Sequence, residues 1–554
     1  MANTHIDQAA KIPQVPPDEC ISETTEKILP TSSTLDSAPQ LDDDGSTQHR
    51  AALSRARRVV VAGLMITPYF LTSSNSASAF MLIPSIQRDL GGSQLAVQWV
   101  ASAYTLANGC GLLVSGRLAD MYGRKKLFLI GMCLNGVFCL ASGFIRILIP
   151  LCILRALAGL GLAIAMPAGF GIIGSTFDQE PGRTIAFAIM GTGWPLGSGV
   201  SQVLGAFIAT ARPESWSYIF VLLGGLAIVT AAVTLFVIPM DKDPKRRLVD
   251  RRIDMIGAVL ITLAISLLSF SITQGGLVHR GWREPYIPCV FCLSIITVLA
   301  FGLWQHHLKR KNALPPLVDL DIFTRFKGKI TALLAVTFTS YTAINGWLYV
   351  ASQWFQVLKG ETPLEFALHT LTAPIMGLVA CLIVPLVAVR VRAPILLVFG
   401  CFSTAAACWL FAAQPSGSTY WSFEFIANIV NPWGADFTVG IGSVLISNFA
   451  IGDEQSLLGA LFQTVIAFSG TIGTCLASLI QTKQYESSGD IRKSLDAAWW
   501  FLAGMSWLAC LITIAFLRDI KLAKDVKRDL AHLDKGAEIA TAIPSDPTTI
   551  QTSG

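Results

Sequence analysis

Long apolar runs constrain this chain more than any other feature, because a helix needs about 20 mostly apolar residues to cross a bilayer. Fourteen such runs occur in the 554 residues, of which 53% are hydrophobic and 14% charged. The runs cover 59–83, 97–115, 127–145, 148–173, 185–210, 216–239, 256–274, 286–304, 330–351, 367–389, 395–413, 423–447, 457–481 and 497–517. This pattern predicts an all-α integral membrane protein with 14 transmembrane helices in a lipid bilayer.

Lysine and arginine predict the orientation, because cytoplasmic loops are enriched in these residues. If the N-terminus is cytoplasmic, the inner loops carry nineteen of them and the outer loops carry nine. Basic residues also precede the first run and follow the last one, which places both termini in the cytoplasm. The net charge of +5 therefore reflects topology, and we expect no nucleic-acid partner.

The two ends of the chain differ from its apolar body. Residues 1–58 are polar and have no apolar period, which predicts a disordered cytoplasmic tail and not a cleaved signal peptide. Residues 518–554 begin with a lysine-rich stretch and are interpreted as a second cytoplasmic tail. We assign neither tail a chemical role.

Residues 116–126, between the second and third runs, form a short charged loop. Gly116 and Gly123 permit close backbone approach, while Asp120 and Arg124 carry opposite charges at helical spacing, with Lys125 beside them. We expect this loop to lock against a neighbouring helix.

Small residues recur every four positions in the fifth run. The series is Gly193, Gly197, Ser201, Gly205 and Ala209. Such a face allows a second helix to approach closely. Pro195 lies inside the series and predicts a bend, because proline removes a backbone hydrogen bond.

Two charged residues lie inside apolar runs, where an unpaired charge costs at least about 2.5 kcal/mol. Arg155 lies in the fourth run, and we expect its charge to be compensated by other groups or to extend toward the lipid headgroups. Asp436 lies near the middle of the twelfth run and has the properties of a proton carrier. In the first interpretation Asn431, Pro432, Trp433 and Gly434 open the helix around Asp436. In the second, Pro432 and Gly434 end the helix, so that Asp436 caps a later segment near the surface.

Polar residues within the runs outline what a cavity could bind. They are Asn75, Asn108, Gln202, Asn345, Gln353, Asn428 and Asn431. Trp347, Trp354 and Trp433 lie near some of them, and the mixture suits an amphipathic organic molecule. Each asparagine fits equally well as a hydrogen-bonding contact between helices.

The sequence contains little evidence for a metal site or a catalytic site. All the cysteines except Cys20 lie in or beside apolar runs, and the Cys289 to Cys292 spacing has no second pair nearby. We find no nucleophile with a plausible base and no glycine loop for phosphate. We therefore expect no metal site, no cofactor and no enzymatic activity.

Several of these motifs resemble those of the major facilitator superfamily. The loop from Gly116 to Lys125 is similar to the signature loop between its helices 2 and 3, and Arg155 with Gly159 and Gly161 resembles an element of its helix 4. The segment Gly191–Gly199, with Gly193, Pro195, Gly197 and Gly199, partly matches the superfamily's antiporter signature, although Trp194 and Ser198 depart from it.

The resemblance extends over about residues 59–520 and is most similar to the fourteen-span drug:proton antiporter branch. The runs Gly434–Phe437 and Gln455–Thr464 resemble its fungal aminotriazole-resistance-like members. Members of the branch often carry an aspartate in helix 1, where this chain has Asn75. Since asparagine cannot release a proton at physiological pH, the resemblance leaves Asp436 as the candidate for coupling.

The resemblance implies a fold with residues 59–239 and 330–517 as two six-helix bundles, and 240–329 as two inserted helices with cytoplasmic linkers. Asp120 and Arg124 would close the cytoplasmic side. The candidate coupling and cavity residues are Arg155, Asp436, Asn75, Gln202, Asn345 and Asn431.

The implied function is export of a drug, toxin or secondary metabolite by a monomer, in exchange for protons. Uptake of a nutrient or a cation such as ammonium is the alternative, followed by a sensor without transport. The expected location is the plasma membrane, with the vacuolar membrane second.

Overall fold

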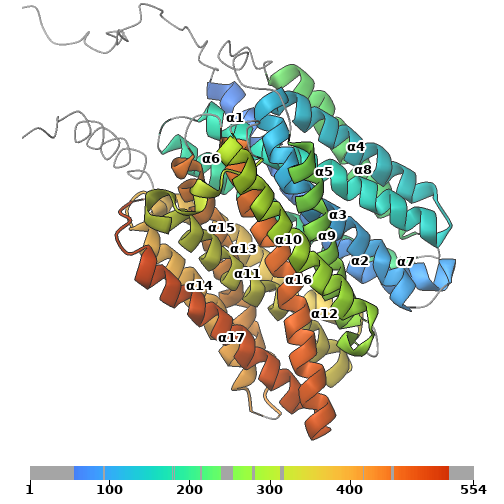
Figure 1. The fold of residues 1–554 in the computed structure, drawn as a ribbon. Coiled ribbons are helices and arrows are strands. Elements are labelled where there is room, and N and C mark those ends of the chain that lie inside the picture. The colour runs from blue at the N-terminus through green and yellow to red at the C-terminus, as the bar shows by residue number, and fades with distance from the viewer. Residues whose placement is uncertain are drawn as a thin grey trace, which may run out of the picture. The chain divides into compact units, whose positions relative to one another are not determined.

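The computed structural model describes residues 55–522 except for short gaps at 92–93, 178, 180, 212–214, 239–253, 278–280, 312–316, 416 and 451–453. The predicted tails, 1–58 and 518–554, lie almost entirely outside the described residues. Every regular element in the described part of the chain is helical (Figure 1).

The first helices in chain order are α1 (Arg55–Leu64), α2 (Ile66–Leu90), α3 (Gln94–Tyr122), α4 (Arg124–Phe144), α5 (Leu148–Thr176), α6 (Gly182–Gly191), α7 (Gly193–Ala211) and α8 (Ser217–Val237). The next are α9 (Met255–Leu277), α10 (Tyr286–Lys311), α11 (Lys329–Gln353), α12 (Pro363–Thr370) and α13 (Thr372–Ala388). The last are α14 (Ala393–Ala412), α15 (Glu424–Phe449), α16 (Gln455–Ser488) and α17 (Ile491–Phe516).

Each of the fourteen predicted runs falls on a helix or on two consecutive helices. Within the described residues, ten helices are long and apolar enough to span a membrane. The other four runs, 59–83, 97–115, 185–210 and 330–351, are also helical, but they are richer in hydroxyl and amide side chains or are interrupted.

Prolines explain the three interruptions. α1 ends at Leu64, α6 ends at Gly191 and α12 ends at Thr370, and each of these residues precedes a proline by four positions. Since proline has no N–H, the carbonyl four residues earlier loses its helical donor. The bend predicted from Pro195 therefore lies at Thr192, between α6 and α7.

The helices pack in two groups, which contact each other through several helices. In the first group α3 and α4 pack on α5, α2 packs on α7, and α4 runs beside α8 (Figure 1). In the second group α14 packs on α15 and α17, and α11 packs on α16 and α17. α9 pairs with α10, while α16 reaches α3 and α5, and α13 reaches α6 and α7.

Glycines set the closest helix contacts. A Cβ atom added at Gly193 would lie 2.5 Å from the carbonyl oxygen of Ile66, and one added at Gly197 would lie 2.4 Å from that of Phe70. The small face of α7 therefore packs directly against the backbone of α2, as its spacing predicts. Large apolar side chains such as Phe236 point outward, where a bilayer would cover them.

Candidate functional site

The charged loop joins the two helix groups through a carboxylate and a helix end. Asp120, near the end of α3, accepts the main-chain N–H groups of Leu457 at 2.9 Å and Ser456 at 3.3 Å. Arg124, the first residue of α4, donates to Asp120 at 3.0 and 3.1 Å, to the Ser456 hydroxyl at 3.2 Å and to the Gly171 carbonyl at 3.1 Å. We call the region where residues 120–124 meet the end of α15 and the start of α16 the loop end.

Asp120 thus acts as the N-terminal cap of a helix in the other group. The first N–H groups of a helix have no intrahelical partner, and the N-cap residue of α16, Glu454, makes no side-chain hydrogen bond to them. A carboxylate at this position also complements the positive end of the helix dipole. A buried carboxylate of the first group therefore contacts the start of a helix in the second group.

Glycine permits this contact. A Cβ atom at Gly116 would lie 2.4 Å from that of Ala460 and 2.8 Å from the Ser456 carbonyl oxygen. Gly123 has φ 111°, a conformation that favours glycine, and it turns the chain from α3 into α4. The hydrogen bonds of Lys125 stay within the first helix group. Its ammonium donates to the carbonyls of Leu235 at 2.8 Å and Ile238 at the end of α8.

A second arginine at the loop end was not predicted as a site residue. Arg183 in α6 is buried and donates to the main-chain oxygen of Ser447 at 2.8 Å, to its hydroxyl at 2.6 Å and to Gln455 at 3.3 Å. Gln455 also accepts from the Ser447 hydroxyl at 2.8 Å. In the sequence Arg183 was only one of the basic residues of an inner loop, so its burial was not apparent.

Arg155 in α5 is fully buried, so the predicted extension toward headgroups is wrong. Its guanidinium donates to the side-chain oxygen of Asn75, to the main-chain oxygen of Asn75 at 3.1 Å and to the Val100 carbonyl at 3.2 Å. It also lies 4.5 Å from the ring centre of Tyr104 and 4.7 Å from that of Phe220. All these partners belong to the first helix group, and no carboxylate pairs with Arg155 among the described residues.

Asp436 lies in the middle of a continuous α15, which runs through Pro432 to Phe449. The two predictions that Pro432 and Gly434 end or open the helix are therefore wrong. Gly434 instead allows α14 to approach, since its added Cβ would lie 1.8 Å from the Thr404 hydroxyl. Asp436 is 8% exposed, and the Cys381 thiol donates to it at 3.4 Å.

Asp436 lies where the two helix groups meet. It lines a cavity about the size of one water molecule, together with Ala188, Gly191, Cys381, Val384, Val439 and Gly440. A Cβ atom at Gly377 would lie 2.9 Å from Asp436 Oδ2 and 3.0 Å from the Pro195 ring. The carboxyl group therefore faces the break between α6 and α7, and it has no cationic partner in the described part of the chain.

No hydrogen bond joins the other predicted cavity residues to Asp436 in the described part of the chain. Asn345 donates to the Tyr341 carbonyl of its own helix at 3.0 Å. The side-chain oxygens of Gln202 in α7 and Asn431 in α15 are buried and have no hydrogen-bond partner. Arg155 and Asn75 form a separate site within the first group.

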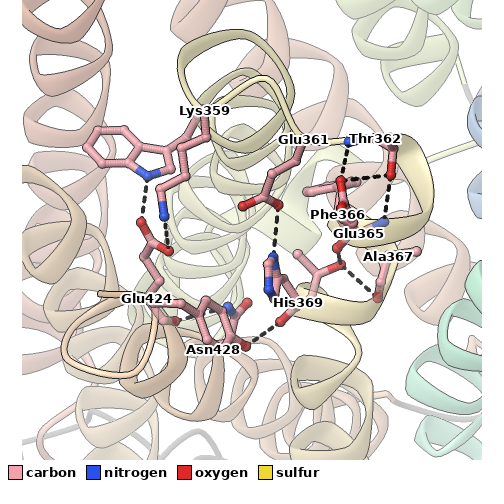
Figure 2. Close-up of polar contacts among 12 residues, drawn as sticks. Lys359, Glu361, Thr362, Glu365, Phe366, Ala367, His369, Glu424 and Asn428 are labelled. Atoms are coloured by element: carbon pink, nitrogen blue, oxygen red, sulfur yellow. Dashed lines mark hydrogen bonds and ion pairs between the residues drawn. The ribbon is translucent and has the colours of Figure 1, made fainter. Parts of the chain in front are cut away.

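A polar cluster at the start of α15, which is the end away from the loop end, was also not predicted from the sequence (Figure 2). Glu424 is fully buried and accepts from Trp354 at 2.8 Å, Gln414 at 3.0 Å and Lys359 at 2.7 Å. A π-helical turn, Trp354–Leu358, ends α11 and brings Trp354 and Lys359 to this carboxylate. From sequence, Glu424 fits an ordinary acidic residue in the first turn of a helix.

Comparison with known proteins identifies relatives along most of the chain. The family described as Major Facilitator Superfamily matches residues 66–474. The efflux pump terJ of Aspergillus terreus is 26% identical over 77% of this chain and 81% of its own length. The low affinity ammonium transporter of Saccharomyces cerevisiae is 24% identical over 82% of this chain and 87% of its own.

The aminotriazole resistance protein of Saccharomyces cerevisiae is 23% identical over 80% of this chain and 81% of its own length. Among solved structures, the proton:xylose symporter XylE bound to 6-bromo-6-deoxy-D-glucose matches with a TM-score of 0.60 and 13% identity. The match covers 86% of this chain and 99% of that structure, which shows a common fold.

Proposed function

Because this chain belongs to the Major Facilitator Superfamily, we propose that it is a secondary active transporter that exports an amphipathic organic compound in exchange for protons. The names of relatives such as the efflux pump terJ and the aminotriazole resistance protein support export. The corresponding substrate class is drugs, toxins or secondary metabolites.

Asp436 is the observation that carries the proposal of proton coupling. It is a buried carboxyl group whose described partner is a thiol, and it faces the joint between the two helix groups. An ionised carboxylate in such a place lacks a counter-ion, whereas a protonated one is neutral. Exposure of Asp436 to water on alternate sides would therefore bind and release a proton.

Alternating access supplies that exposure. The two bundles would be 59–239 and 330–517, with 240–329 carrying the inserted helices, and they would rock around a midplane site. The contacts of Asp120 with α16 support a state in which the loop end is closed. Following the distribution of basic residues, we assign the loop end to the cytoplasm, with both termini on that side.

The buried amide oxygens of Gln202 and Asn431 are the acceptors that we propose for donor groups of the substrate. Arg155 has a neutral partner, Asn75, so we do not assign it to the proton cycle. We propose that the protein acts as a monomer in the plasma membrane, and that it has no catalytic activity.

Uptake is the second candidate, because the low affinity ammonium transporter of yeast is a relative of similar identity and coverage. Direction of flux separates the two functions. Cells with the gene deleted should be compared with complemented cells by untargeted mass spectrometry of cell contents and medium. A compound retained in the deletion cells supports export, and one left in the medium supports uptake.

The identified compound then tests coupling in vesicles with an imposed pH gradient. We expect Asp436→Asn to abolish accumulation driven by the gradient but to retain exchange of labelled for unlabelled compound. Asp436→Glu, which keeps an ionisable group, is the matched control. A correctly inserted Asp436→Asn protein with full gradient-driven accumulation contradicts the coupling assignment.

A further inference from the structure

The connection from the inserted helices to α11 makes an unusual turn. It comprises η3 (Leu320–Phe323) and η4 (Arg325–Gly328). Phe326 has φ 54° and Lys327 has φ 59°, and Gly328 follows with φ 75°. Residues with a Cβ atom rarely adopt this left-handed conformation, and two in succession persist only when surrounding contacts hold them.

Contacts are made within the turn and on the segment before it. The ring of Phe326 stacks on that of Phe449, the last residue of α15, with centroids 5.4 Å apart. Before the turn, Lys309 of α10 pairs with Asp319 at 2.9 Å and also with Asp321. The strained segment is thereby held against the corner between α15 and α16.

The turn directs one side chain to the start of α16. Arg325 donates to Glu454 with a separation of 2.7 Å, and both side chains are about three-quarters buried. Glu454 occupies the N-cap position of α16, where a side-chain oxygen ordinarily accepts from the first N–H groups of the helix, usually one of Ser, Thr, Asp or Asn. Here its carboxylate is held by Arg325 and caps nothing.

Asp120 accepts hydrogen bonds at the helix start that Glu454 does not cap. The N–H groups of Ser456 and Leu457 both donate to Asp120. Two carboxylates near one helix end repel each other, and only one can accept these two donors. A Glu454 side chain released from Arg325 would therefore compete with Asp120 for α16.

We propose that Arg325 is a positioning residue for transport, which holds Glu454 away from the start of α16 so that Asp120 can bind there and close the loop end. The inference rests on the alternating access proposed above but not on the identity of the substrate or on Asp436. It also gives the inserted segment a role, because Arg325 belongs to the connection that follows α10.

Hydrogen–deuterium exchange of the full-length protein in detergent measures this contact at the amides of Ser456 and Leu457. We expect Arg325→Ala to accelerate exchange there about fivefold, on the scale of one charge at a helix terminus. Glu454→Gln should leave protection intact, because the neutral side chain does not repel Asp120. Arg325→Lys, which keeps the charge, should remain within about twofold of the wild type.

The double variant Arg325→Ala/Glu454→Gln is decisive. We expect it to regain the protection that Arg325→Ala loses, since no competing carboxylate remains. Failure of the double variant to recover would show that Arg325 only anchors the connection.

A transport assay in the same variants links protection to turnover. With the compound identified by mass spectrometry, we expect Arg325→Ala to lower the maximal rate more than it changes the half-saturating concentration. The double variant Arg325→Ala/Glu454→Gln should regain the maximal rate. Unchanged transport in Arg325→Ala together with lost protection would overturn the role in transport. Loss of gradient coupling in Asp436→Asn is scored separately and does not bear on this result.

Discussion

Arg155 donates hydrogen bonds to both the side chain and the main chain of one residue, Asn75. The two residues lie on α5 and α2, and the guanidinium is fully buried between two aromatic rings. A neutral amide residue thus supplies two acceptors to a buried cation. The positive charge is stabilised by acceptors and rings, and no proton-binding group is required.

Replacement of Asn75 tests this arrangement. We expect Asn75→Leu to lower the free energy of unfolding by about 2 kcal/mol, because a buried charged donor loses its acceptor. Asn75→Asp keeps the acceptor and adds a counter-ion, so its stability should equal or exceed that of the wild type. Thermal unfolding in detergent measures both variants, and an Asn75→Leu protein as stable as the wild type would show that Arg155 finds other acceptors.

The pair also shows where sequence reasoning reaches its limit. The position of Arg155 inside an apolar run allowed burial or extension toward the headgroups, and the partner that it contacts lies 80 residues away along the chain. Only the packing of α2 against α5 brings the two together. The identities of both residues were therefore predicted as relevant, while their contact was not.

Gly377 separates Asp436 from Pro195, and an alanine there would contact both residues. Overpacking of this kind costs about 1–3 kcal/mol, so we expect Gly377→Ala to reduce thermal stability and slow transport. Gly191→Ala is the matched control, because Gly191 lines the same cavity and its added Cβ meets nothing within 4 Å. Equal effects of the two substitutions would argue against a tight contact at Asp436.

Gly116 offers a test of closure at the loop end. Its added Cβ would lie 2.4 Å from that of Ala460, so Gly116→Ala must push α16 away and break the 2.9 Å contact from Leu457 to Asp120. We expect faster amide exchange at the start of α16 and little transport, with the helical content preserved in circular dichroism. Gly302→Ala, with nothing within 4 Å of its added Cβ, should behave as wild type. Normal transport by Gly116→Ala would mean that closure does not need this contact.

Helix existence was predictable from the apolar runs, whereas helix continuity was not. The sequence around Pro195 and Pro432 does not show which proline interrupts a helix. In the structure α6 ends before Pro195, whereas α15 continues through Pro432. The outcome depends on neighbouring helices, which accept or exclude a bend at each proline. Burial of Arg183 and Glu424 has the same origin, because each becomes enclosed only when distant segments pack around it.

Glu424 and Lys359 allow the energetic role of a buried carboxylate with a partly exposed cationic partner to be measured. Lys359→Ala leaves the fully buried carboxylate without its cation, and removal of one partner from such a pair costs about 3 kcal/mol. Glu424→Gln should cost less, because its amide oxygen still accepts from Trp354 and the partly exposed Lys359 can turn to water. The double variant Lys359→Ala/Glu424→Gln should unfold close to Glu424→Gln alone, because neither variant retains a buried charge. Thermal unfolding of the three proteins would contradict this account if Glu424→Gln were the least stable, since the carboxylate would then contribute more than its pairing with Lys359 explains.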